Sequence, residues 1–321
     1  MGEGTRAIEI NLAQSHVMIS PRELKSMFER GENLSAALRQ QAGTTGNTEE
    51  IIEWSYDIQS GSYIQALQKA EYATYNQNYT TEIARLLTSL GQSQSILEAG
   101  VGEATTLGNV VRKLDTPDIA YYGFDLSWSR TASARQWLQQ ESIPGISLCT
   151  ASLLHMPYAT DSIDIVYTSH TIEPNGGREE SILRELHRVT RRYLVLLEPS
   201  YELANDEARR RMESHGYCRN LLGIASSLGY RIIEHKLFPY TANPLNPTAL
   251  TIIEKLATTP PIANPLACPR LKTPLQNVDG MLFSPEALTV YPIIGEIPCL
   301  RLENGIIASR YLEFCNRESP L

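Results

Sequence analysis

Two glycines directly after a short apolar segment form the part of this sequence best suited to bind a ligand. The segment Ser95-Ile96-Leu97-Glu98-Ala99 is followed by Gly100-Val101-Gly102. Glycine permits a sharp turn from a strand into a helix, and it lets the backbone approach a ligand closely. Gly100 and Gly102 therefore predict a binding loop, although a glycine pair alone does not identify the ligand.

Glu98 and Thr105 narrow the choice of ligand. Dinucleotide-binding loops have a third glycine, and Thr105 stands in its place here. Glu98 puts a carboxylate just before the first glycine, where it repels a diphosphate but suits a ligand with an amino group and a sulfonium. Both residues disfavour NAD, so an NAD-dependent oxidoreductase is an alternative rather than the first interpretation.

Asp125 ends a second apolar segment, which begins at Ile119. It lies about 20 residues beyond the glycine loop, where a carboxylate commonly accepts hydrogen bonds from two ribose hydroxyls. Such a contact predicts a ligand that contains adenosine, without choosing between NAD and S-adenosylmethionine. Asp125 could alternatively cap a helix that begins near Ser127.

Polar residues that could take part in chemistry follow the fourth and fifth apolar segments. Ligands of doubly wound sheets bind beyond the carboxyl ends of the strands. His170 is the first candidate for a general base, because the pKa of histidine lies near neutral pH; it could also only cap the strand. Glu173 could orient His170 or bind substrate, and Glu198 could bind a polar substrate group or cap the following helix.

Alternating apolar and amphipathic segments predict the elements that position these residues. Strands are expected at 95–99, 119–125, 146–149, 163–167 and 193–197, with helices at 105–114, 127–140 and 178–189 between them. Strict alternation predicts a parallel, doubly wound α/β sheet with helices on both faces. A helix at 206–228 and strands at 230–237 and 248–254 follow. The last connection is too short for a crossover helix, so these two strands should be antiparallel.

The order of these motifs resembles that of class I S-adenosylmethionine-dependent methyltransferases. Three segments carry the resemblance, namely 97–105, 123–127 and 154–164, together with the final antiparallel pair, which dinucleotide-binding folds usually lack. The resemblance implies a Rossmann-like methyltransferase fold, S-adenosylmethionine as methyl donor and S-adenosylhomocysteine as product.

The resemblance also implies cofactor contacts. Gly100 and Gly102 would face the methionine part, Asp125 would hold the ribose, and Leu126 would pack on the adenine. Family members often have an aspartate where this chain has Ser152, and a neutral serine binds the adenine amino group more weakly. The remaining predicted cofactor contacts are Glu98, Thr105, Leu153, Ser169, Tyr56 and Tyr63.

The sequence predicts that the chain is divided into three structural parts. Residues 1–90 form an N-terminal arm and a helical cover, whose aromatic residues Trp54, Tyr56 and Tyr63 could close over the cofactor or form a core stripe. The S-adenosylmethionine-binding domain spans 91–256. Residues 257–321 form a small proline-rich lobe.

That C-terminal lobe resembles the zinc-ribbon module that accompanies many methyltransferases. Of the four ligand positions only Cys268 is a cysteine, because the others are Leu271, Ser284 and Ala287. A structural zinc site needs four ligands, so the lobe is expected to fold without a metal.

The composition limits the class of partner. The net charge of -8 and the pI near 5.4 argue against nucleic-acid binding, and the run Arg209-Arg210-Arg211 is expected to be a solvated helix face. No apolar run approaches the ~20 residues of a membrane span, and Met1 to Ser20 do not resemble a signal peptide.

Five scattered cysteines indicate a reducing, cytoplasmic setting. A homodimer is compatible with the sequence.

The first hypothesis is transfer of a methyl group to a polar small molecule, such as a hydroxyl of a sugar or of a secondary-metabolite intermediate, by in-line displacement. A methyltransferase fold that binds without catalysis is a second hypothesis. An RNA or protein substrate is disfavoured by the acidic balance.

Overall fold

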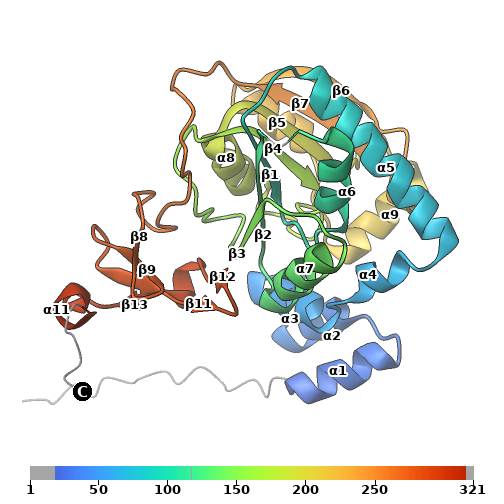
Figure 1. The fold of residues 1–321 in the computed structure, drawn as a ribbon. Helices are drawn as coiled ribbons and strands as arrows, with labels where there is room; N and C mark the ends of the chain where they lie inside the picture. The colour runs from blue at the N-terminus through green and yellow to red at the C-terminus, as the bar shows by residue number, and fades with distance from the viewer. Residues whose placement is uncertain (1–18, 117, 316–321) are drawn as a thin grey trace, which may run out of the picture.

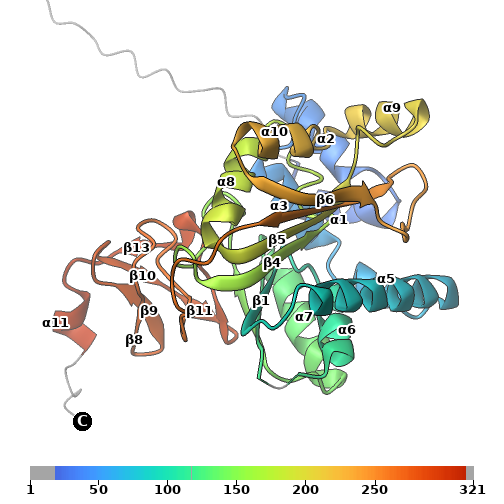
Figure 2. The same ribbon diagram turned by 90° about the horizontal axis from the view of Figure 1, so that it is seen from above.

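A seven-stranded sheet forms the centre of the molecule, with helices on both faces (Figures 1 and 2). The computed structural model describes residues 19–116 and 118–315, so the prediction made for Met1 to Ser20 falls almost entirely outside the described residues. The strands are β1 (Ser95–Ala99), β2 (Ala120–Asp125), β3 (Ile146–Thr150), β4 (Ile163–Ser169), β5 (Thr190–Pro199), β6 (Arg231–Leu237) and β7 (Thr248–Glu254).

The strand order is β3-β2-β1-β4-β5-β7-β6. Strands β1 to β5 run parallel, whereas β7 is antiparallel to both β5 and β6. The predicted doubly wound sheet and the antiparallel final pair are both confirmed. Residues 99–102, 125–127 and 169–173 consequently meet at one edge, where the parallel strands end.

Each face of the sheet is covered by its own hydrophobic cluster. Helices α5 (Ala70–Ser89), α6 (Thr105–Leu114) and α7 (Trp128–Gln140) bury apolar residues against one face. Helices α8 (Glu179–Val189) and α10 (Leu221–Ser227) cover the other face. Burial of these stripes, at roughly 1.5–3 kcal/mol per large apolar side chain, holds the helices on the sheet.

The expected helix at 206–228 is two helices, so that prediction was wrong. Helix α9 (Asp206–His215) ends at Gly216, whose φ of +67° lies in the left-handed region. The chain then turns back, and the Cys218 amide donates to the Glu173 carbonyl at 2.8 Å before α10 begins. The first half of helix α5 has tyrosines and amides in place of aliphatic residues at helical spacing, which begin only at Ile83.

Four short helices precede α5, in the segment expected to form an N-terminal arm and a helical cover. They are α1 (Pro21–Glu29), α2 (Leu34–Ala42), α3 (Glu49–Ile58) and α4 (Ser62–Ala66). The first three enclose a small core of their own around Leu24, Leu34, Leu38 and Ile51. The chain from α3 to α5 passes the edge of the sheet at which the parallel strands end (Figure 1).

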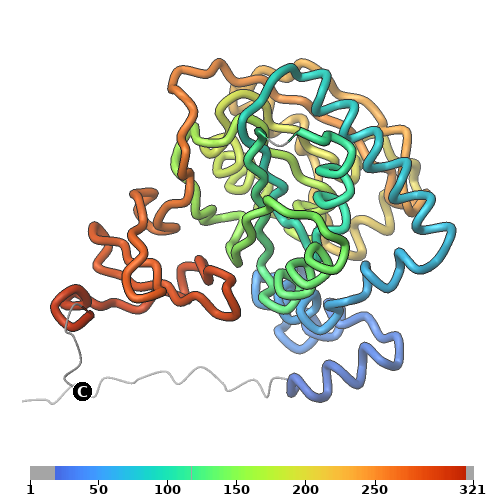
Figure 3. Tube along the Cα trace, in the orientation of Figure 1, coloured from blue at the N-terminus to red at the C-terminus, as the bar shows by residue number. Residues whose placement is uncertain are grey.

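The C-terminal lobe adds a second, smaller sheet. Its strands β8 (Gln276–Val278), β9 (Met281–Ser284), β10 (Thr289–Tyr291) and β13 (Ile306–Ile307) pair antiparallel, beside a hairpin of β11 (Ile293–Ile294) and β12 (Ile297–Pro298). A 3-10 turn (Leu302–Asn304) and α11 (Tyr311–Cys315) complete it. Figure 3 follows the chain from β7 to this lobe, which joins the sheet at β3 through the Leu300 amide and the Thr150 carbonyl, 2.8 Å apart.

Within the lobe, the Cys268 thiol is hydrogen-bonded to the Tyr291 hydroxyl at 3.7 Å. In the ranges that the structure describes, no group of histidine, cysteine, aspartate and glutamate side chains could hold a metal ion. No helix in those ranges is both long and apolar enough to cross a bilayer.

A buried ion pair joins the strands at the opposite edge from their carboxyl ends. Asp164 at the start of β4 is 1% exposed, and its Oδ1 accepts from the Arg191 guanidinium at 2.5 Å. Its Oδ2 accepts from the Gln94 amide at 2.7 Å, just before β1. The pair therefore links the N-terminal ends of β1, β4 and β5.

Arg191→Gln is expected to lower the free energy of unfolding by about 3 kcal/mol, because it leaves Asp164 as an unpaired buried carboxylate. Arg184→Gln, which removes a pair with Glu180 whose side chains are both 60% exposed, should lower it by less than about 1 kcal/mol. Urea denaturation of both variants measures the difference. Equal effects would contradict the role of the buried pair.

Candidate active site

A pocket of about 380 Å³ lies where β1, β2 and β4 end. It receives residues from the cover, from the three strand ends, from α9 and from the β6–β7 connection. Twelve predicted site residues line it: Tyr56, Tyr63, Glu98, Gly100, Gly102, Thr105, Asp125, Leu126, Leu153, Ser169, His170 and Glu173. Ser152 and Glu198 are the two predicted site residues that do not line it.

The glycine loop packs directly against the loop that follows β4. A Cβ on Gly100 would lie 2.0 Å from Thr171 Cγ2, and the φ of Gly100 is +74°. The Thr171 hydroxyl donates to the Gly100 carbonyl at 3.0 Å. No other residue fits at this position without displacing Thr171, which explains the first glycine of the motif.

Asp125 is held with its carboxylate in a fixed orientation. Its Oδ2 accepts from the Gly102 amide and its Oδ1 from the Ser127 amide, both at 2.9 Å. The N-cap of α7 is Ser127 itself, whose hydroxyl accepts from the Arg130 amide. Burial raises the pKa of Asp125, and the Arg130 charge opposes this shift.

Glu98 is a buried carboxyl group at the bottom of the pocket. Its Oε2 accepts from the Tyr167 hydroxyl at 2.8 Å. Burial raises the pKa of Glu98 to about 8, against the lowering effect of that hydrogen bond. Without a positive ligand beside it, this group is therefore largely protonated at neutral pH.

Ser152 is linked to the cover by a hydrogen bond. Its hydroxyl donates to Glu49 Oε1 and accepts from the Leu154 amide at 3.0 Å. Glu49, the first residue of α3, lines the pocket together with Leu153. The sequence does not identify Glu49 as a pocket residue, because nothing in the local pattern connects α3 with the loop after β3.

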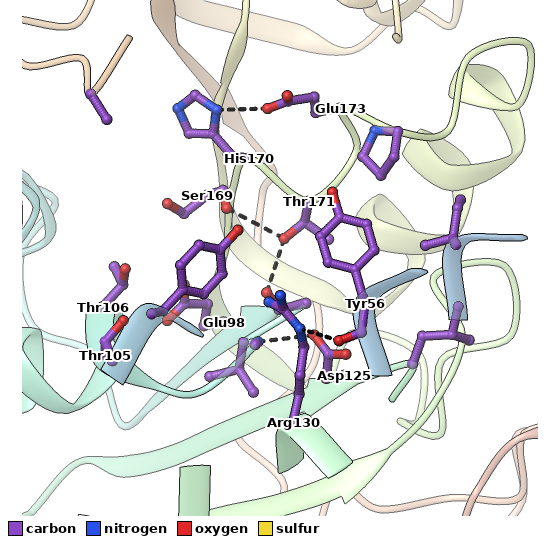
Figure 4. Close-up of a pocket in the computed structure, with 18 of the residues that line it drawn as sticks. Tyr56, Glu98, Thr105, Thr106, Asp125, Arg130, Ser169, His170, Thr171 and Glu173 are labelled. Carbon is purple, nitrogen blue, oxygen red and sulfur yellow. Dashed lines mark hydrogen bonds and ion pairs between the residues drawn. The ribbon is translucent and has the colours of Figure 1, made fainter. Parts of the chain in front are cut away.

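Arg130 is a second pocket residue that the sequence does not identify. It is 2% exposed, and its guanidinium carbon lies 4.7 Å and 4.6 Å from the ring centroids of Tyr56 and Tyr63. Its Nε donates to the Tyr56 carbonyl at 2.9 Å, whereas Nη2 is buried without a hydrogen bond. Figure 4 shows Arg130 beside Asp125 and Tyr56.

His170 and Glu173 form the predicted pair on the other side of the pocket (Figure 4). His170 Nδ1 lies 2.8 Å from Glu173 Oε2, and Nε2 lies 2.8 Å from the Thr248 hydroxyl. Burial alone would lower the pKa of His170, but its hydrogen bond with Glu173 and the Glu173 charge raise it. The same pairing lowers the pKa of Glu173, against the raising effect of burial. The pair thus favours the protonated imidazole.

Glu198 lies beneath the pocket rather than in its wall. Its two oxygens accept from the Thr171 amide at 3.0 Å and from the Glu173 amide at 3.1 Å. It is 2% exposed. This placement makes Glu198 a positioning residue for the loop that carries His170.

Arg211 and Asn246 also line this side of the pocket. Arg210 is exposed, as expected for a solvated helix face. The expectation was wrong for Arg211, because its Nη1 is buried and has no hydrogen bond. The sequence spacing along α9 does not show which arginine of the run faces inward.

Residues 96–192 match a family model described as a methyltransferase domain. Magnesium protoporphyrin IX methyltransferase from Synechocystis PCC 6803, solved with bound S-adenosylhomocysteine, has a similar fold. It is 13% identical with a TM-score of 0.50, and the match covers 65% of this chain and all of that one.

A methyltransferase from Aquifex aeolicus that depends on S-adenosylmethionine is 15% identical with a TM-score of 0.45, over 60% of this chain and 97% of that one. None of the curated proteins matches the sequence at a significant level. The matched segment contains the glycine loop, Asp125 and His170. Residues 96–192 therefore match a methyltransferase domain, and the fold around them is similar to that of the Synechocystis methyltransferase.

Proposed function

We propose that this protein transfers the methyl group of S-adenosylmethionine to an oxygen of a polar small molecule. The observation that carries the proposal is the continuity of the pocket. One cavity joins Gly100 and Asp125, which suit the cofactor, to His170, Glu173 and Asn246, which suit a polar acceptor. Methyl transfer needs both molecules in one enclosure, aligned for in-line displacement.

The residues at the cofactor end fit the parts of S-adenosylmethionine. The Asp125 carboxylate suits the ribose hydroxyls as an acceptor, and the amides of Gly102 and Ser127 fix its orientation. Leu126 and Leu153 lie beside it as apolar walls for the base. The unpartnered nitrogen of Arg130 suits the carboxylate of the methionine part. The bound cofactor supplies a methyl group on a positively charged sulfur.

At the acceptor end, Glu173 orients the His170 ring through Nδ1. The other ring nitrogen, Nε2, is bonded to Thr248. Removal of a proton by His170 therefore requires the neutral ring, although the pairing with Glu173 raises the pKa of His170. It also requires the acceptor hydroxyl to replace the Thr248 hydroxyl at Nε2, or to pass its proton through that hydroxyl. The engagement of both nitrogens is also the observation that favours the second candidate, a protein that binds the cofactor without catalysis. Release of S-adenosylhomocysteine from a metabolite pool would distinguish the two.

Asp125→Ala is expected to weaken S-adenosylhomocysteine binding by more than about 100-fold, because two hydrogen bonds to a charged group each contribute roughly 1.5–3 kcal/mol. Asp206→Ala removes a carboxylate that is 85% exposed and should leave binding unchanged. Isothermal calorimetry measures both. Heat with NAD and none with S-adenosylmethionine or S-adenosylhomocysteine would overturn the proposed function.

Glu49→Gln is expected to change which base the pocket prefers. If Glu49 accepts from the adenine amino group in place of the aspartate that Ser152 replaces, the wild type should bind S-adenosylhomocysteine better than S-inosylhomocysteine, which has a carbonyl there. The variant should bind S-adenosylhomocysteine about tenfold more weakly than the wild type does, and S-inosylhomocysteine more tightly. Competition binding measures the ratio. Glu50→Gln, at an exposed neighbour, is the control, and an unchanged ratio in Glu49→Gln would exclude this contact.

Glu98 predicts proton release on cofactor binding. The free carboxyl has a pKa of about 8, and a positive ligand lowers it. At pH values between 8 and the pKa of Glu98 in the complex, cofactor binding should therefore release up to about one proton. Over this range the affinity for the cofactor should rise with pH. Calorimetry at pH 7 in two buffers of different ionisation enthalpy counts the protons. Glu98→Gln should release fewer, and an equal count would contradict the assignment.

A further inference from the structure

Two arginines line the pocket, and each has a buried nitrogen without a hydrogen bond. The atoms are Arg130 Nη2 and Arg211 Nη1. Among the described residues, neither arginine has a carboxylate within 4.0 Å, whereas Arg209 and Arg219 nearby are both paired with acids. A buried guanidinium nitrogen without an acceptor is unfavourable. Both atoms therefore indicate an anionic ligand.

Arg130 belongs to the cofactor end of the pocket. Its Nη1 would lie 3.5 Å from a Cβ placed on Gly102, and Asp125 and Tyr63 are among the groups that act on its charge. S-adenosylmethionine has one carboxylate. Arg130 suffices for that group, so the cofactor leaves Arg211 without an anion.

Arg211 belongs to the acceptor end. Its guanidinium carbon lies 5.5 Å from the ring centroid of Tyr217. The Tyr217 hydroxyl interacts with Arg211 and with Glu173, and Glu173 is bonded to His170. Arg211 is thus linked through Tyr217 and Glu173 to His170, the candidate base.

Asn246 presents a second unpartnered atom in the same wall. It is 7% exposed, and its Nδ2 donates to Glu173 Oε1 at 3.0 Å. Because the low pKa of Glu173 keeps this carboxylate an acceptor, the amide must direct Nδ2 toward it. Asn246 Oδ1 is left buried without a donor, and a ligand hydroxyl or amino group would supply one.

We infer that the methyl acceptor is a small carboxylic acid, with its carboxylate bound by Arg211 and a hydroxyl or amino group bound by Asn246 Oδ1. Arginine is suited to this role because its planar guanidinium donates two parallel hydrogen bonds to a carboxylate. The tyrosines of α5 that line the pocket, Tyr72, Tyr75 and Tyr79, provide a surface for the rest of the molecule. The inference rests on the proposed function, because it assigns one end of the same pocket to the acceptor.

The test uses glycolate, the smallest probe with both a carboxylate and a hydroxyl. Each protein is first saturated with S-adenosylhomocysteine, so that Arg130 is occupied, and glycolate is then titrated with detection by NMR. Wild type and Arg210→Gln, a matched change at the exposed neighbour, should bind glycolate. Arg211→Gln should bind it at least about tenfold more weakly. The neutral analogue glycolamide should bind all three proteins as weakly as glycolate binds Arg211→Gln.

Asn246→Ala tests the second contact, because it should remove the preference for glycolate over acetate. Equal glycolate binding by Arg211→Gln and Arg210→Gln, equal binding of glycolamide and glycolate by the wild type, or no saturable glycolate binding would overturn the inference and favour a neutral acceptor. The preceding titration with S-adenosylhomocysteine reports folding of each variant. It also separates the two proposals, since a wild type that does not bind S-adenosylhomocysteine contradicts the proposed function itself.

Discussion

The contact between the loop after β1 and the loop after β4 is the constraint on which the pocket depends. Gly100 and Thr171 lie so close that a single added carbon would overlap the threonine side chain. Glu198 reinforces this contact from β5, because it accepts from the amides of Thr171 and Glu173. The ends of β1, β4 and β5 are thereby fixed to one another, and this fixes the positions of the side chains between them. His170 has a φ of +56°, a conformation that costs a non-glycine residue roughly 1–3 kcal/mol, and these contacts maintain it.

The cover is joined to the same loop rather than resting freely on the pocket. Asn47, in the connection before α3, donates to the Pro174 carbonyl at 2.9 Å, and its own carbonyl accepts from Arg178 at 2.7 Å. Arg39 of α2 donates to Asn47 at 2.5 Å. On the other side, Arg301 of the C-terminal lobe forms ion pairs with Glu53 of α3 and with Glu303. The lobe therefore supports the helix that carries Glu49 and Tyr56, so both ends of the chain contribute to the shape of the pocket.

Charge divides the pocket into two ends. Asp125 and Arg130 lie together at the end that suits the cofactor (Figure 4), whereas Glu173, His170 and Arg211 form a connected network at the other end. Glu98 lies at the bottom, and burial suppresses its ionisation until a positive group arrives. The charged form of each of these groups is stabilised by a specific neighbour or a ligand, because the buried site offers little water to do so.

The sequence by itself determined the sheet, the glycine loop and the carboxylate of Asp125, because these depend on neighbours within one strand, turn and helix. Apolar alternation specifies where a strand lies, and the residue at its end must then face the common edge of a parallel sheet. The same local signal failed at Gly216, where the tertiary bond between Cys218 and Glu173 turns the chain. Only the tertiary structure decided that Glu49, Arg130, Arg211 and Asn246 share one pocket. They come from α3, α7, α9 and the β6–β7 connection, and no periodicity within a segment records which side chains meet across the fold. Tertiary contacts also decided the role of Glu198, since the amides that it binds belong to a loop that only the folded sheet brings beside it.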